Sequence, residues 1–218
     1  QAQCDFGPRV PGTAAHISAR DYLVESLTPY AKGVELQSFS QRTRNGTIDL
    51  HNIIAPITGN LEGGYLLCAH WDTRPIAERD PDPANRSSPI LGANDGASGV
   101  AVLLEMARHL SAVPPPVPVA IVLFDGEDYG TRIDTMFLGS RRYAQDPVLE
   151  TPRYAILLDM VGDADLDIPI EGHSWLAAPE LVEGIWELAA ATGIRSFNWG
   201  MSGPIFDDHL MLIRAGIP

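Results

Sequence analysis

The sequence has little positive charge, few cysteines and no long apolar run. Its 218 residues hold 15 Lys and Arg, with Lys32 as the single lysine, against 28 Asp and Glu, and the net charge is −13. Such a surface repels a phosphate backbone, so we do not expect nucleic acid as a partner. The two cysteines, Cys4 and Cys68, are too few for a disulfide framework. No run approaches the roughly 18 apolar residues that a membrane span needs, so we expect no membrane span.

What remains is an ordinary globular composition. Hydrophobic residues make up 45% of the chain and charged residues 20%, which is enough apolar surface for a substantial core and excludes wholesale disorder. The length suits one large α/β domain, and the polar loop at 81–89 is too short to link two domains. We therefore predict a single domain over residues 1–218.

Two periodicities divide the chain into helices and strands. Apolar residues at helical spacing predict helices over 13–31, 96–110 and 175–192. Alternating or solidly apolar runs predict strands over 34–39, 47–56, 65–69, 119–124 and 154–158, with a hairpin across Arg44-Asn45-Gly46. This alternation predicts an α/β fold: a three-layer sandwich with a central mixed, mostly parallel sheet flanked by helices.

Acidic residues and a histidine follow the ends of the buried strands. They are His70 and Asp72, Glu127 and Asp128, Asp159, and Asp95 on a glycine-flanked turn that opens a helix. Open α/β sheets bind ligands beyond the carboxyl ends of their strands, so we expect these side chains to converge. Taken singly, each has a plain structural explanation, such as a helix cap for Asp95 or a solvated turn at Glu127.

The joint occurrence is harder to explain structurally. Converging carboxylates repel one another unless a cation or shared protons neutralise them. A cation held by carboxylate and imidazole solves the problem, and zinc is the usual ion for such mixed ligands. The residues themselves therefore predict a metal site.

Five motifs in register resemble a known family. They are His70-Trp-Asp72, Gly92-Ala-Asn-Asp95-Gly-Ala-Ser-Gly99, Asp125-Gly-Glu127-Asp128, Leu158-Asp159-Met and Asp207-Asp208-His209. Together they resemble the M28 zinc aminopeptidase superfamily, a group with the zinc-exopeptidase fold. The segments Phe6–Gly12, Asp128-Tyr-Gly130 and Leu138-Gly-Ser140 are most similar to the animal-type glutaminyl cyclases, which are glutaminyl-peptide cyclotransferases, and to their bacterial relatives.

The resemblance implies a role for each matched residue. Asp95 and Asp128 would be carboxylate ligands of a catalytic zinc, and Glu127 would be the general acid and base. Asp159 and Asp207 would join Glu127 in a catalytic hydrogen-bond network.

His70 and Asp72 would support these ligands in a one-zinc cyclase. In a two-zinc aminopeptidase, His70 and Asp159 would instead hold a second metal ion, and Asp95 would bridge the two ions. Asp72 would then lie beside that second site.

The family's remaining zinc ligand is a histidine beyond the Asp-His pair, and this sequence reaches Pro218 without one. We expect that the chain lacks a C-terminal segment, so that the zinc site is incomplete within residues 1–218. The alternative is a protein that has lost its metal. His209 is expected to be structural rather than a substitute ligand.

The acid at position 207 favours the cyclase over the aminopeptidase, because the aminopeptidases resembled here carry Ser before Asp-His. The predicted function is conversion of N-terminal glutamine to pyroglutamate with release of ammonia. An M28-type aminopeptidase that hydrolyses N-terminal residues is the alternative, and a decayed binding domain is the third reading. Either enzyme would act on peptide or protein N-termini.

The substrate pocket is expected among aromatic residues. Trp71, Trp199 and Phe206 are the candidates, whereas Phe137 is expected to pack in the core. By resemblance alone, the protein is expected in the periplasm or outside the cell. The oligomeric state is left open.

Overall fold

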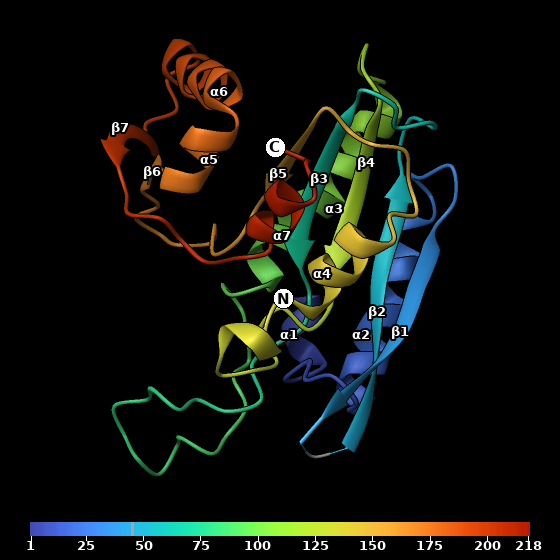
Figure 1. Ribbon diagram of the computed structural model, residues 1–218, viewed down its shortest axis with the longest axis vertical. Helices are drawn as coiled ribbons and strands as arrows, with labels where there is room; N and C mark the ends of the chain where they lie inside the picture. Colours follow the sequence, from blue (N-terminus) through green and yellow to red (C-terminus); the bar gives the residue numbers. More distant parts are fainter. Residues whose placement is uncertain (45) are drawn as a thin grey trace.

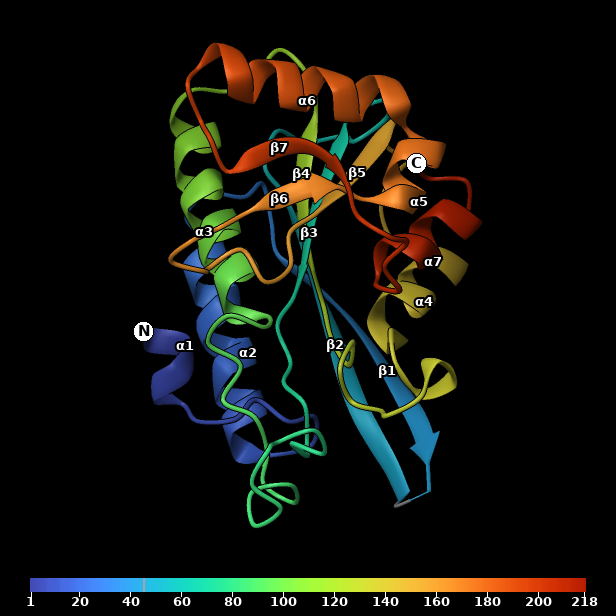
Figure 2. The same cartoon turned by 90° about the vertical axis from the view of Figure 1, so that its left-hand side faces the viewer.

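A five-stranded mixed sheet forms the centre of the protein (Figures 1 and 2). The computed structural model describes residues 1–44 and 46–218. The strands are β1 (Glu35–Thr43), β2 (Gly46–Pro56), β3 (Tyr65–His70), β4 (Val119–Phe124) and β5 (Tyr154–Leu157). Their order is β1-β2-β4-β3-β5.

The pairing of these strands confirms the predicted mixed sheet. β3, β4 and β5 pair in parallel, whereas β2 runs antiparallel to both β1 and β4. All strands except β2 therefore point the same way. The predicted hairpin of β1 and β2 is also present, and Asn45 of its turn lies outside the described residues.

Helices cover both faces of the sheet, as the edge-on view in Figure 2 shows. α2 (Ala14–Leu27) and α3 (Ala97–Ala112) pack on one face, and α4 (Leu138–Gln145) and α7 (His209–Arg214) pack on the other. Two short helical turns, α1 (Ala2–Asp5) and η1 (Ile133–Thr135), lie outside these layers. The three-layer prediction is confirmed. Among the helices of the described residues, none is both long and apolar enough to cross a bilayer.

β4 explains why these layers form. All six of its residues are buried, and alternate side chains point to opposite faces. Ile121 and Leu123 join the core beneath α2 and α3, while Val122 and Phe124 join the core on the α4 side. A strand that is apolar at every position needs cover on both faces, and the two helical layers provide it.

A smaller unit lies beside the β5 edge of the sandwich (Figure 1). It combines α5 (Gly172–Ala177) and α6 (Pro179–Ala191) with the parallel strands β6 (Ile168–Ile170) and β7 (Phe197–Met201). Val182, Trp186 and Phe197 belong to its own apolar cluster. β6 and β7 were not predicted from the sequence, because such short strands show too little alternation to be recognised.

The helix predicted over 175–192 is wrong in one respect. The helix is interrupted at Ala178, whose φ of −143° and ψ of 58° are not helical, so α5 and α6 are separate helices. A residue before proline avoids helical backbone, and proline suits the first turn of a new helix. Pro179 therefore starts α6.

α3 passes very close to the end of β5 at Gly99. A Cβ atom at this position would overlap the carbonyl oxygen of Leu158. Leu158 directly precedes Asp159, one of the predicted catalytic acids. The missing side chain of Gly99 therefore lets β5 deliver Asp159 close to α3.

This contact yields a paired prediction. Gly99→Ala is expected to lower the free energy of unfolding by about 1–3 kcal/mol, because neither backbone can move away without disturbing the core. Gly184→Ala is the control, since Gly184 is exposed in α6 with open space around its Cα. That change is expected to stabilise the protein by up to about 1 kcal/mol through helix propensity. Urea unfolding measures both, and equal effects would contradict the close approach.

Candidate active site

His70 lies at the centre of a cluster of carboxylates. It is the last residue of β3, and its side chain is 1% exposed. Nε2 lies 2.9 Å from Oδ1 of Asp95 and 3.3 Å from Oδ1 of Asp159. Nδ1 lies 3.4 Å from Oδ1 of Asp72 and 3.9 Å from Oε2 of Glu127. The predicted convergence at the strand ends is thus present in the structure.

The turn before α3 brings Asp95 to His70. Gly96 follows Asp95 with φ of 83°, in the left-handed region that favours glycine. A Cβ atom there would lie 3.0 Å from Cε1 of His70 and 3.0 Å from the carbonyl oxygen of Asp72. Glycine therefore serves two needs at once: it makes the turn and leaves room for the imidazole.

Asp72 fixes the turn that carries the predicted general base. Its buried carboxylate accepts the backbone N–H of Glu127 at 3.0 Å and that of Asp128 at 3.2 Å. The turn after β4 is thereby tied to the turn after β3. Asp72 thus orders the backbone of the site, in addition to its contact with His70.

Arg9 holds further backbone of the site from behind. Its side chain is fully buried, and it donates Nε to the carbonyl of Trp71 at 2.9 Å and Nη2 to that of Gly92 at 2.8 Å. Nη1 donates to the carbonyls of Leu91 at 3.0 Å and Gln3 at 3.4 Å. The sequence analysis gave Arg9 no role, and its place in the Phe6–Gly12 motif is the signal that could have found it.

Glu127 is a buried carboxyl group with a strongly altered acidity. Burial, together with the negative charges of Asp208 and Asp207, raises its pKa well above the usual value. Burial and the charge of Asp159 likewise raise the pKa of Asp207 to about 6. A carboxyl group with a raised pKa can both accept and donate a proton near neutral pH. The structure therefore supplies the environment that a general acid and base needs.

Asp128 has a cationic neighbour that the sequence analysis did not predict. Arg74 donates from its Nη1 to Oδ1 of Asp128 and from Nε to Oε2 of Glu78 at 3.0 Å. Burial and the charge of Asp95 nevertheless raise the pKa of Asp128 to about 7. Arg74 therefore neutralises part of the negative charge at this end of the sheet.

The donor set fits a metal ion. Ligand atoms of His70, Asp95 and Asp159 all lie within 4.8 Å of one another. Nε2 of His70 and Oδ1 of Asp159 are buried and lie 3.3 Å apart, yet among the described residues neither makes a hydrogen bond of normal geometry. Imidazole and carboxylate groups that converge in this way suit zinc. Asp128 lies outside this triad, so its role as a zinc ligand stays a prediction.

The structure separates the predicted pocket aromatics. Trp199 and Phe206 are each 53% exposed, so both are accessible to a substrate. Phe137 is buried in a cluster with Leu210 and Met211, as expected for a packing residue.

Trp71 is not accessible to a substrate, because no part of it is exposed, so this part of the expectation needs correction. It is fully buried and stacks on His16 with 4.4 Å between ring centroids. Its Nε1 donates to the carbonyl of His51 at 3.1 Å. His16 in turn contacts Asp125 at 2.9 Å, so Trp71 belongs to a buried network behind the site.

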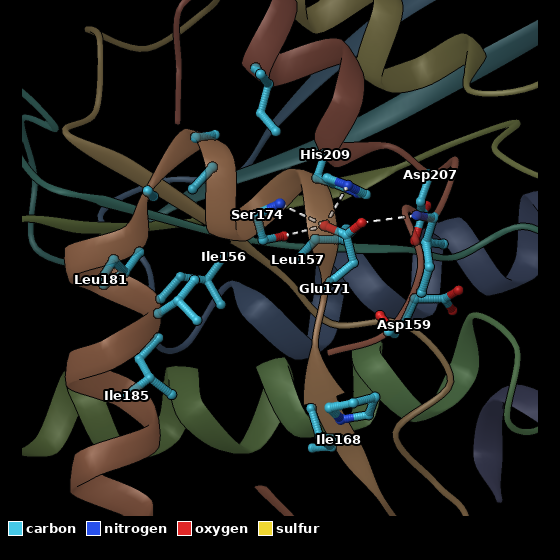
Figure 3. A pocket seen from close by; sticks show the side chains of 18 of the residues that line it. Ile156, Leu157, Asp159, Ile168, Glu171, Ser174, Leu181, Ile185, Asp207 and His209 are labelled. Atoms are coloured by element: carbon cyan, nitrogen blue, oxygen red, sulfur yellow. Dashed lines mark hydrogen bonds and ion pairs between the residues drawn. The ribbon is translucent and has the colours of Figure 1, made fainter. Parts of the chain in front are cut away.

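A cavity of about 360 Å³ adjoins the carboxylates (Figure 3). Asp159 and Asp207 lie on the same side of it, and Glu171 and His209 line it nearby. Its other walls are apolar and come from β5 and α6, including Ile156, Leu181 and Ile185.

Comparison with known proteins agrees with this geometry. The sequence matches Peptidase family M28 over residues 52–218. The chain belongs to that family. This M28 protein is 28% identical to the glutaminyl-peptide cyclotransferase of Drosophila melanogaster over 97% of its own length, and it spans 65% of the length of that relative.

Solved structures of two kinds of enzyme resemble the M28 protein. A Zn-dependent exopeptidase from Parabacteroides distasonis is 38% identical over the whole of this chain, with a TM-score of 0.95. The glutaminyl cyclase of Bacteroides thetaiotaomicron bound to N-acetylhistamine is 37% identical over 99% of this chain, also with a TM-score of 0.95. This chain covers 78% of each. The resemblance and the fold class inferred from the sequence are confirmed.

The carboxylate cluster predicts how stability depends on pH. Raised pKa values mean that the folded M28 protein, freed of metal by a chelator, binds more protons than the unfolded chain between about pH 4 and pH 7. The stability from these groups is then fully present below the pKa values of the unfolded chain. It is lost as the pH rises through the pKa values of the folded protein. We expect a lower unfolding midpoint at about pH 7.5 than at about pH 5.

Other groups and a control sharpen this test. The lowered pKa values of His51 and His209 act in the opposite direction, whereas the raised pKa of His70 adds to the effect. Asp128→Asn should flatten the pH dependence, because it removes one group that takes up a proton on folding. A midpoint that rises across this interval in the chelated protein would contradict the expected charge cluster.

Proposed function

We propose that this protein is a zinc-dependent glutaminyl-peptide cyclotransferase, which converts N-terminal glutamine to pyroglutamate and releases ammonia. The observation that carries the proposal is the buried Glu127, whose pKa is raised by burial and by the acids at 207 and 208. Similarity to the Drosophila cyclotransferase and the Bacteroides glutaminyl cyclase supports the same reaction. The substrates would be peptides and proteins that begin with glutamine.

The reaction is an intramolecular substitution. The α-amino nitrogen of the substrate attacks the carbon of its own side-chain amide, and the bond from that carbon to the amide nitrogen breaks. Glu127 takes a proton from the α-ammonium group and gives it to the departing amide nitrogen, which leaves as ammonia. The second proton that the α-nitrogen loses on ring closure passes to solvent. The negative charges of Asp208 and Asp207 favour a proton on Glu127, and Asp159 in turn raises the pKa of Asp207. Because the ring closes within one molecule, correct orientation supplies much of the rate.

Asp95 and Asp128 would hold the zinc ion in this proposal. Bound zinc supplies a Lewis acid that polarises the side-chain amide carbonyl of the substrate. His70 would keep Asp95 in place through the 2.9 Å contact from its Nε2. Arg74 would balance the charge of Asp128.

One observation favours a second candidate, an aminopeptidase. The triad of His70, Asp95 and Asp159 is arranged as a second metal site requires, with its ligand atoms within 4.8 Å of one another. Two metal ions would suit hydrolysis of an N-terminal residue. Glu127 would then take a proton from water rather than from the substrate amine. The similarity to the Zn-dependent exopeptidase supports this alternative.

Substitution of the predicted base separates catalysis from metal binding. Glu127→Gln keeps the size of the side chain but cannot take up the proton, so we expect turnover to fall by at least about 100-fold. Zinc per chain, measured by mass spectrometry, should not change, because Glu127 is not among the predicted ligands. Asp95→Ala is the matched variant and should lose both zinc and turnover. Loss of zinc in Glu127→Gln would show that the assignment is wrong.

The two enzyme readings differ in their products. Incubation with a glutamine-initiated peptide is expected to release ammonia and leave the peptide at full length, less the mass of ammonia. Incubation with an amino-acid anilide is expected to give no free amino acid. Release of the N-terminal residue would favour the aminopeptidase. If a zinc-loaded protein releases neither product, the binding-domain reading replaces both.

A further inference from the structure

A single carboxylate outside the catalytic cluster contacts the chain on both sides of Asp207. Glu171 lies between β6 and α5, in the smaller unit beside the sheet. We propose that Glu171 is a positioning residue that sets the orientation of Asp207. The inference rests on the proposed function only in that it takes Asp207 to be catalytic.

The first role of Glu171 is to cap a helix. Oε1 accepts the backbone N–H of His173 at 2.9 Å, and Oε2 accepts the N–H of Ser174 at 2.6 Å and its Oγ–H at 2.7 Å. These bonds satisfy amide groups at the start of α5 that have no partner within the helix. An aspartate would serve equally well as a cap at this position.

The second role reaches beyond the helix. Oε1 of Glu171 also accepts the backbone N–H of Ile205 at 2.9 Å, and Oε2 lies 3.5 Å from Nε2 of His209. Ile205 and His209 stand two residues before and two residues after Asp207. Figure 3 shows Glu171 between His209 and the chain segment that carries Asp207. Capping α5 alone does not require these contacts to residues distant in the sequence.

The charge of Glu171 suits this role. Although burial alone would raise it, the hydrogen bonds from His173, Ile205 and Ser174 lower its pKa to about 2. The group therefore stays ionised over the whole range in which enzymes are assayed. Hydrogen bonds to an ionised carboxylate are stronger than those to neutral acceptors, so the amide of Ile205 is firmly held.

Ser140 holds the backbone on the other side of Asp207, through the carboxylate of Asp208. Asp208 is fully buried and accepts Oγ–H of Ser140 at 2.5 Å, which pins the segment to α4. Oδ1 of Asp207 accepts the N–H of Asp208 at 2.6 Å. With Ile205 held by Glu171 and Asp208 held by Ser140, the backbone on both sides of Asp207 is fixed. Its carboxylate then remains on the side of Asp159, whose charge raises its pKa.

The two roles of Glu171 can be separated by one methylene group. Glu171→Asp should retain the cap on α5 but be too short to reach Ile205 and His209. We expect kcat to fall by about 10- to 100-fold, because small displacements of a catalytic group cost that much. KM should change by less than about twofold. Ser174→Ala is the matched control, because it removes a cap contact and leaves the contact to Ile205 intact. Its kcat should equal that of the unaltered protein.

A double-mutant cycle tests whether Glu171 acts through Asp207. In an Asp207→Asn background, Glu171→Asp should produce little further loss of kcat, since the group that it positions is already disabled. A full additional loss in that background would mean that Glu171 acts elsewhere, and an unchanged kcat in the single variant would equally overturn the inference. Either product, ammonia or free amino acid, can report kcat in this experiment.

Hydrogen exchange provides a readout that does not depend on turnover. The amides of Ile205 and Asp208 should exchange faster in Glu171→Asp, and both should stay protected in Ser174→Ala. If the protein turns over neither substrate, the proposed function fails, and exchange alone decides the inference. Full protection of both amides in Glu171→Asp would then reject it.

Discussion

The concentration of negative charge at the carboxyl ends of β3, β4 and β5 is the constraint on which the rest of the structure depends. Parallel strands deliver their ends to one edge, so His70, the turn at 125–128 and Asp159 arrive there together. Buried carboxylates at such an edge need protons, cations or hydrogen-bond donors. The protein supplies backbone amides to Asp72, a guanidinium to Asp128 and an imidazole to Asp95. Among the described residues, Nε2 of His70 and Oδ1 of Asp159 lie at ion-pair distance but make no hydrogen bond of normal geometry, and a metal ion would complete both.

The same arrangement is compatible with two reactions because both need a base beside a Lewis acid. Glu127 can take its proton from an amine or from water, and its surroundings raise its pKa in either case. The difference between the reactions lies in the neighbours of Glu127. An acid at 207 adds negative charge where it stabilises a proton on Glu127, whereas the triad around His70 has ligand atoms close enough to hold a cation. In this M28 chain the acid at 207 and the triad around His70 belong to the same cluster, because Glu127 lies 3.9 Å from His70.

Much of this architecture could be predicted from the sequence, and the exceptions have different physical causes. The strands at 65–69 and 119–124 are apolar at nearly every position, and their burial follows directly. The strand at 154–158 was also expected to be buried, but β5 is a half-buried edge strand. The smaller unit was missed because β6 and β7 are short and because Ala178 divides the predicted helix. Arg9, Arg74 and Glu171 escaped prediction for a different reason. Their partners are mostly backbone atoms or distant side chains, which leave no periodic signal in the sequence. Trp71 was expected in the substrate pocket but is buried, because a tryptophan between two site residues can point toward the site or into the core.

Arg9 has a consequence for the order in which the molecule becomes complete. The carbonyl groups of Trp71 and Gly92 that it binds lie 62 and 83 residues away along the chain. Contacts between such distant segments close large loops and are expected to form late in folding. A buried guanidinium is also costly until every acceptor is in place, so Arg9 can dock only after both turns have taken their native shape. We therefore expect the edge that carries the carboxylates to become rigid late in folding, after the strands behind it have paired.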